Sequence, residues 1–221
     1  MKRKSLNLPN LLSIIRVLLV PIFVASLLFM RRLGVWGHLV PAALFGITAF
    51  TDMLDGKIAR KYGLVTDFGK FIDPLADKFM IIGSQIAVLV WLMLKGESFR
   101  LLALIFVWVV LVILLRELGV TSLRLVVAGK SGIVVAASML GKIKTVSQMI
   151  GTVVIILEPI VPYLRDTHIL SYVAMAVMLF TTLVSGLDYL KAYIPHIDPD
   201  EKLERAPESN TESENGVSKN D

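Results

Sequence analysis

The chain has 221 residues, of which 55% are hydrophobic, and its mean hydropathy is +0.72. This apolar content exceeds the ~45–50% of an ordinary soluble domain and falls in long runs, which excludes a typical water-soluble fold. The sequence has no cysteine, so disulfides and thiolate metal sites are excluded. The formal net charge of +5 suits anionic substrates and lipid headgroups. Nucleic acid is a poor match, because the positive charges lie between apolar segments.

Six apolar segments follow one another along the chain. They cover approximately residues 8–30, 35–53, 71–94, 99–127, 139–157 and 169–190. Each has about 20 residues, enough to cross a ~30 Å hydrocarbon core as a helix. No segment alternates with a period of two residues, and helices satisfy their own backbone groups in lipid. The sequence therefore predicts an all-α integral membrane protein with a six-transmembrane-helix bundle over residues 1–194.

The basic residues are distributed unequally between the two sides of such a bundle. One side holds the N-terminus, the 57–78 and 116–144 regions and the C-terminal tail, whereas the other keeps five arginines and lysines. This imbalance predicts that both termini are cytoplasmic. Residues 195–221 are polar and rich in Glu, Ser and Asn, so we expect a disordered cytoplasmic tail there. His38, His168 and His196 are expected in loops or in the tail.

Four aspartates lie within one short window, at the end of the second segment and the start of the third. Asp52 and Asp55 are three residues apart, and Asp73 and Asp77 are four apart, so each pair shares a helix face. A short turn near residues 62–63 makes the two helices neighbours, so the four carboxylates can converge. Carboxylates near hydrocarbon repel one another and are costly to desolvate, and divalent cations are the natural solution. Oxygen ligands favour hard ions such as magnesium, manganese or calcium.

The residues around the aspartates indicate phosphate chemistry at the predicted cytoplasmic side. Two metal ions could clamp a pyrophosphate and stabilise a leaving group, and one uncommitted carboxylate could act as a general base on an alcohol. Gly56 and Ala59 are small enough for a ligand to approach the backbone. Arg60 offers a forked donor for a phosphate.

The complete pattern, D-x2-D-G-x2-A-R-x8-G-x3-D-x3-D over residues 52–77, resembles the signature of the CDP-alcohol phosphotransferase family. The resemblance implies an enzyme that transfers the phosphatidyl group of CDP-diacylglycerol to an alcohol and releases CMP. It also implies two Mg²⁺ or Mn²⁺ ions on Asp52, Asp55 and Asp73, with Asp77 near them and acting as the base. The CDP site would be lined by Asn10, Gly56, Ala59, Arg60 and Gly69. A homodimer in the bacterial inner membrane is expected.

Three further stretches bear on the acceptor alcohol: residues 7–16, 116–124 and 141–148. They resemble the family members whose acceptor is sn-glycerol 3-phosphate. Arg116 and Arg124 are two helical turns apart and share a face, so with Lys142 and Lys144 they predict a pocket for the acceptor phosphate. Plain positive-inside topology or lipid-headgroup contact is the alternative for Arg124, Lys142 and Lys144. A local ion pair between Arg116 and Glu117 is disfavoured, because adjacent helical residues do not face each other.

Two rival functions stay open from sequence alone. Within the family, the acceptor could be serine, an inositol phosphate or phosphatidylglycerol. In a different class, the protein could be a divalent-cation transporter that uses the acids as its path. A transporter is expected to place acids near mid-bilayer on several spans. Here the acids lie on two consecutive segments near one membrane face, which favours the enzyme.

Overall fold

The computed structural model describes residues 8–62, 67–131 and 139–193, and within these ranges it is helical with no strand. The long helices are α1 (Leu8–Phe29), α2 (Trp36–Tyr62), α3 (Asp67–Met93), α4 (Arg100–Ser131), α5 (Met139–Leu157) and α7 (Ile169–Tyr193). Short elements join them at one end of the bundle, namely η1 (Met30–Arg32), η2 (Glu97–Phe99), η3 (Glu158–Ile160) and α6 (Pro162–Arg165). The all-α prediction is confirmed. The predicted tail, residues 195–221, lies outside the described residues.

Five helical stretches in the described ranges are long and apolar enough to cross a membrane. They are Asn10–Arg32, Phe71–Met93, Glu97–Val127, Met139–Ile160 and Ile169–Tyr193. These spans make the chain a multi-pass membrane protein. The second predicted span falls in α2, which is 27 residues long but has charged residues throughout its last three turns. The sixth crossing therefore stays a prediction.

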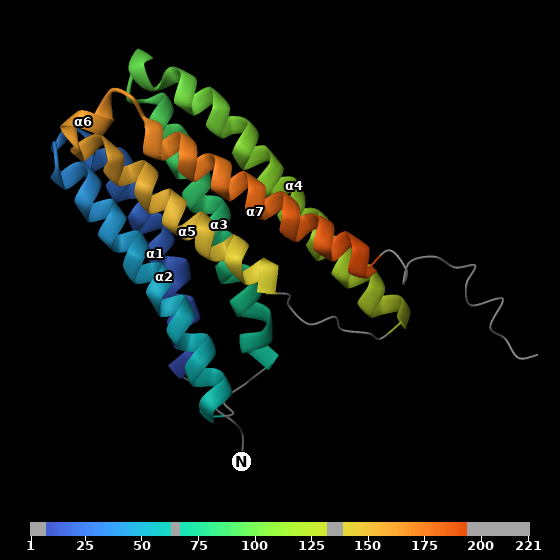
Figure 1. Cartoon of the computed structure of the whole chain (residues 1–221). Coiled ribbons are helices and arrows are strands. Elements are labelled where there is room, and N and C mark those ends of the chain that lie inside the picture. Colours follow the sequence, from blue (N-terminus) through green and yellow to red (C-terminus); the bar gives the residue numbers. More distant parts are fainter. Residues whose placement is uncertain (1–7, 63–66, 132–138, 194–221) are drawn as a thin grey trace, which may run out of the picture.

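The long helices lie side by side, as Figure 1 shows, with α1 packed against α2 and α3, and with α7 packed against α4 and α5. Large side chains fill the space between them: the Phe23 and Phe45 rings lie 5.4 Å apart, and Trp91 is fully buried. Other large apolar side chains, such as Trp108 and Phe180, face outward. This outer apolar surface is what a lipid environment requires.

Buried hydrogen bonds tie α3, α5 and α7 together. Gln85 Nε2 donates to Thr152 Oγ1 at 3.1 Å, and Gln148 Nε2 donates to Thr182 Oγ1 at 3.0 Å. All four side chains are at most 1% exposed. Interhelical hydrogen bonds between such polar side chains hold membrane helices in register. They therefore fix the rotation of the helices that carry the site described below.

A second polar cluster lies at the end of the bundle where α3 ends and the short elements join the long helices. Lys95 Nζ lies 3.0 Å from His38 Nε2 and 4.4 Å from the centre of the Trp91 ring. His38 Nδ1 lies 2.8 Å from the Ile156 carbonyl oxygen. His38 belongs to helix α2, so the prediction that it lies in a loop was wrong. Burial, and then the nearby charge of Arg165, lower the pKa of Lys95 to about 8.

Candidate active site

A cavity of about 890 Å³ opens at the end of the bundle where α2 and α4 end and α3 and α5 begin. Its size lies within the ~300–1,000 Å³ range of small-molecule sites. Helices α2 and α3 supply an acidic wall, and α4 and α5 supply a basic wall. The charged lining residues are Arg16, Asp52, Asp73, Asp77, Lys78, Arg116, Glu117, Arg124, Lys142 and Lys144. Three of the four predicted metal ligands and all four predicted acceptor-phosphate residues therefore line one cavity.

The acidic wall follows from helical spacing. Asp73 and Asp77 are one turn apart on α3 and both face the cavity, while Ala76 and Met80 are buried and hold α3 in the bundle. Asp52 reaches the same cavity from α2. The Asp77 side chain is 55% exposed, more than that of Asp52 at 25%.

Helix α1 contacts all three of these aspartates. Arg16 Nη1 forms an ion pair with Asp52 Oδ1 at 2.6 Å and donates a hydrogen bond to Asp77 Oδ1, and the Arg16 side chain is only 1% exposed. Ser13 Oγ donates to Asp73 Oδ1 at 2.5 Å. The sequence interpretation gave neither Ser13 nor Arg16 a chemical role. The available signal was a lone arginine inside an apolar segment, which usually marks an interior or wet position.

The donor chemistry of the acidic wall fits a divalent cation, because carboxylate oxygens are the preferred ligands of hard ions. Among the described residues, however, no group of three or more acidic or histidine side chains is close enough to hold an ion. The side chain of Asp55 lies outside the described part of the chain. Arg16 supplies the counter-charge between Asp52 and Asp77 in this structure. The predicted ligand set therefore stays a prediction.

The residues predicted to bind CDP are only partly described. Gly56, Ala59 and Arg60 belong to the last turns of α2, but their side chains lie outside the described part. Asn10 and Gly69 are buried on α1 and α3, and neither is a lining residue of the cavity. The CDP site stays a prediction.

On the basic wall, Arg116 and Arg124 share a helix face, as predicted. Both guanidinium groups lie over the Tyr189 ring of α7, at 5.2 and 5.8 Å from its centre. Arg116 Nη2 also donates to Ser185 Oγ. A side chain at Gly186 would lie 3.3 Å from Arg116 Cγ, so a small residue there lets α7 approach α4 closely. Helix α7 thus positions both arginines.

Glu117 corrects one expectation. Arg116 Nη1 donates to Glu117 Oε1 at 3.2 Å, so the prediction that adjacent residues would not pair was wrong. Both side chains line the cavity, where the long arginine side chain reaches the carboxylate of the next residue. Lys144, from α5, donates to the same Glu117 oxygen. In contrast, Lys142 is exposed and forms no ion pair within the described ranges.

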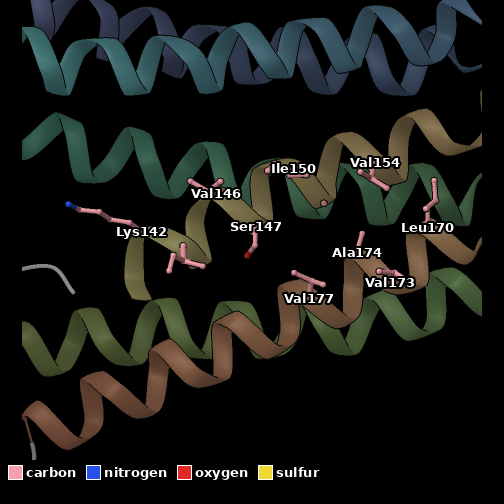
Figure 2. Close-up of a pocket in the computed structure, with 11 residues that line it drawn as sticks. Lys142, Val146, Ser147, Ile150, Val154, Leu170, Val173, Ala174 and Val177 are labelled. Atoms are coloured by element: carbon pink, nitrogen blue, oxygen red, sulfur yellow. The ribbon is translucent and has the colours of Figure 1, made fainter. Parts of the chain in front are cut away.

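An apolar groove of about 510 Å³ runs between α5 and α7 and meets the polar cavity. Lys142, Val146 and Ile150 line both spaces. Figure 2 shows the Lys142 side chain at one end of the groove and a row of aliphatic side chains leading away from it along the two helices. The shape and lining fit an alkyl chain whose polar end lies at the cavity.

The fold and the site together define a class, namely a multi-pass membrane protein with an acid- and base-lined cavity beside an apolar groove. Residues 6–184 match the family model described as CDP-alcohol phosphatidyltransferase, and the chain belongs to this family. It is 40% identical over 195 residues to the CDP-diacylglycerol–glycerol-3-phosphate 3-phosphatidyltransferase of Bacillus subtilis, covering 83% of this chain and 93% of the relative.

Two other relatives have names that describe the same kind of enzyme. A protein of Mycobacterium tuberculosis named as a probable phosphatidylglycerophosphate synthase is 36% identical, over 83% of this chain and 80% of its own length. The CDP-diacylglycerol–glycerol-3-phosphate 3-phosphatidyltransferase of Pseudomonas fluorescens is 33% identical, over 90% of this chain and 96% of its own length. The predicted family is therefore confirmed.

Proposed function

We propose that this chain is a phosphatidylglycerophosphate synthase, which transfers the phosphatidyl group of CDP-diacylglycerol to sn-glycerol 3-phosphate and releases CMP. The observation that carries this conclusion is its 33–40% identity, over most of its length, to relatives named for that reaction. The cavity supports the same conclusion, because its acidic and basic walls suit a pyrophosphate-bearing donor and a phosphate-bearing acceptor.

In the reaction, a primary hydroxyl of glycerol 3-phosphate attacks the phosphorus that carries diacylglycerol. A new P–O bond to that oxygen forms, and the P–O bond to the CMP phosphate breaks, so CMP leaves with its phosphate. Asp77 takes the hydroxyl proton, and its exposure to the cavity suits this general-base role. The acceptor phosphate docks on the basic wall, toward Arg116, Arg124, Lys142 and Lys144.

The donor headgroup belongs at the acidic wall. Asp52, Asp55, Asp73 and Asp77 would hold two Mg²⁺ or Mn²⁺ ions. When bound, these ions would neutralise the pyrophosphate and stabilise the departing CMP. The CDP moiety would bind near Asn10, Gly56, Ala59, Arg60 and Gly69.

The lipid part of the donor belongs in the membrane. The groove between α5 and α7 fits an acyl chain and joins the polar cavity at Lys142 (Figure 2). The excess of basic residues at the cavity end favours a cytoplasmic site, with both termini cytoplasmic, in a bacterial inner membrane. A homodimer is part of the proposal, and light scattering of the purified protein tests it.

The decisive experiment is CMP release by the purified protein in detergent with CDP-diacylglycerol and Mg²⁺ or Mn²⁺. Glycerol 3-phosphate, serine, inositol phosphate and phosphatidylglycerol are offered separately. We expect release only with glycerol 3-phosphate and none after chelation. Release with another acceptor instead would overturn the acceptor assignment. No release by folded protein with any acceptor would favour the cation-transporter alternative.

Two variants separate the proposed roles. Asp77→Asn should abolish turnover while CDP binding persists, and equal loss of both would mean that Asp77 serves chiefly to bind metal. Lys142→Gln should raise KM for glycerol 3-phosphate about tenfold or more, because a charge-assisted contact to phosphate is lost. Glu97→Gln, at an exposed position of η2, is the matched control and should change neither quantity.

A further inference from the structure

The basic wall contains one acid whose arrangement the proposed reaction does not explain. Among the lining residues that α4 and α5 contribute, Glu117 is the only acid. Its Oε1 atom accepts from Lys144 and, at 3.2 Å, from Arg116. The three side chains are 14%, 6% and 11% exposed, respectively. A carboxylate at this position repels a phosphate, so it is not there to bind one.

Glu117 lines the cavity, and its second carboxylate oxygen, Oε2, takes no part in these contacts. Within the described part of the chain, Oε2 has no hydrogen-bond partner, and it is not fully buried. An ionised carboxylate accepts about four hydrogen bonds and donates none. The open oxygen therefore matches a neutral donor on the ligand that occupies this cavity.

Glycerol 3-phosphate, the acceptor of the proposed function, has three polar groups. Its phosphate suits the exposed cations Arg124 and Lys142, and its reacting hydroxyl belongs at Asp77. The group that is left is the secondary hydroxyl on the central carbon, which is an uncharged donor. We propose that Glu117 is a specificity-determining residue that accepts a hydrogen bond from this secondary hydroxyl. This inference rests on the proposed function and adds to it the recognition of the glycerol backbone.

The contacts around Glu117 support this role because they fix its position before the ligand arrives. Lys144 holds the carboxylate from α5, and Arg116 holds it from α4 while being fixed in turn by Ser185 and Tyr189 of α7. Three helices thus fix the carboxylate of Glu117 through Oε1 and leave Oε2 as an acceptor. A site built to hydrogen-bond a substrate hydroxyl rejects an analogue that lacks it, because the polar group is then left unpaired.

The test compares glycerol 3-phosphate with 3-hydroxypropyl phosphate, which keeps the phosphate and the reacting hydroxyl but lacks the secondary hydroxyl. We expect the unaltered protein to prefer glycerol 3-phosphate by roughly 10- to 100-fold in kcat/KM. Glu117→Gln should reduce this preference to a few-fold, because a neutral amide oxygen is a weaker acceptor. Lys142→Gln is the matched control, since it should slow both acceptors equally and leave the preference unchanged.

The preference is a ratio measured within one preparation, so loss of folded protein does not alter it. If Glu117→Gln does not fold, Glu117→Asp keeps the charge but shortens the side chain, and it should lower the preference as well. Equal use of both acceptors by the unaltered protein would overturn this inference alone. If a folded Glu117 variant keeps the preference of the unaltered protein for glycerol 3-phosphate, Glu117 does not recognise the secondary hydroxyl and the inference is wrong. No CMP release with glycerol 3-phosphate would instead overturn the proposed function.

Discussion

Replacing Arg16 by Met tests whether α1 stabilises the acidic wall. The substitution removes a buried guanidinium that contacts both Asp52 and Asp77, and it leaves two carboxylates without this counter-charge. A charge-assisted hydrogen bond contributes ~1.5–3 kcal/mol, and the lower value applies here because Asp77 is half exposed. Counting the ion pair with Asp52 at the same value, the two contacts give about 3 kcal/mol. For a soluble domain of this size, that is a fall of roughly 6–12 °C in Tm.

The assay is thermal unfolding in detergent at one scan rate, with and without Mn²⁺. A divalent ion neutralises the same carboxylates as Arg16, so Mn²⁺ should raise the Tm of Arg16→Met more than that of the unaltered protein. Arg100→Met is the control, because Arg100 pairs with Glu97 at 3.2 Å with both side chains at least 70% exposed. Such pairs contribute ~0–1 kcal/mol. An unchanged Tm for Arg16→Met, or an equal Mn²⁺ shift, would refute the reasoning.

Three other predictions concern stability and use the same unfolding assay. Gly37→Ala should destabilise by ~1–3 kcal/mol, because the new Cβ would lie 2.3 Å from the Met30 carbonyl oxygen, whereas Gly46→Ala meets nothing within 4 Å and should not. Glu158→Ala should lower Tm by several degrees, since this buried carboxylate accepts from two backbone amides at the start of α7; an unaffected Tm would contradict that cap. The pKa of Lys95 is about 8 when folded and 10.5 in an unperturbed lysine, so the unfolded chain binds more protons between those values. Stability should therefore rise from pH 8 to 10.5, and Lys95→Met should lose that component of the pH dependence.

The sequence was sufficient for the features that depend on local spacing. Long apolar runs predicted the helices, because a helix in lipid must satisfy its own backbone and present apolar side chains. The four-residue spacing of Asp73 and Asp77 placed both on one face, and the eight-residue spacing of Arg116 and Arg124 did the same. These predictions needed only the helical repeat.

Contacts between distant helices could not be predicted in the same way. Arg16 and Asp77 are 61 residues apart, and their contact depends on how α1 is rotated against α3. Lys144 was expected to bind substrate phosphate, but its contact with Glu117 depends on how α4 and α5 are rotated relative to each other. The Arg116–Glu117 pair was missed because the rule for neighbouring residues ignores how far a guanidinium can bend. Side-chain length and helix rotation thus decide what helical spacing leaves open.

Each wall of the cavity contains a buried or partly buried residue of the opposite charge that pairs with its neighbours. Arg16 lies between two aspartates on the acidic wall, and Glu117 lies between Arg116 and Lys144 on the basic wall. Without them, like charges would face one another in a partly buried space, which is unfavourable. Because each counter-charge is held by its own wall, the acids and bases can stay on separate helices and leave the cavity open between them. The proposed donor carries a pyrophosphate, which would bind metal ions at the acidic wall, and the proposed acceptor carries a phosphate, which would bind at the basic wall. The separation of acids and bases therefore matches the charges of the two substrates bound side by side.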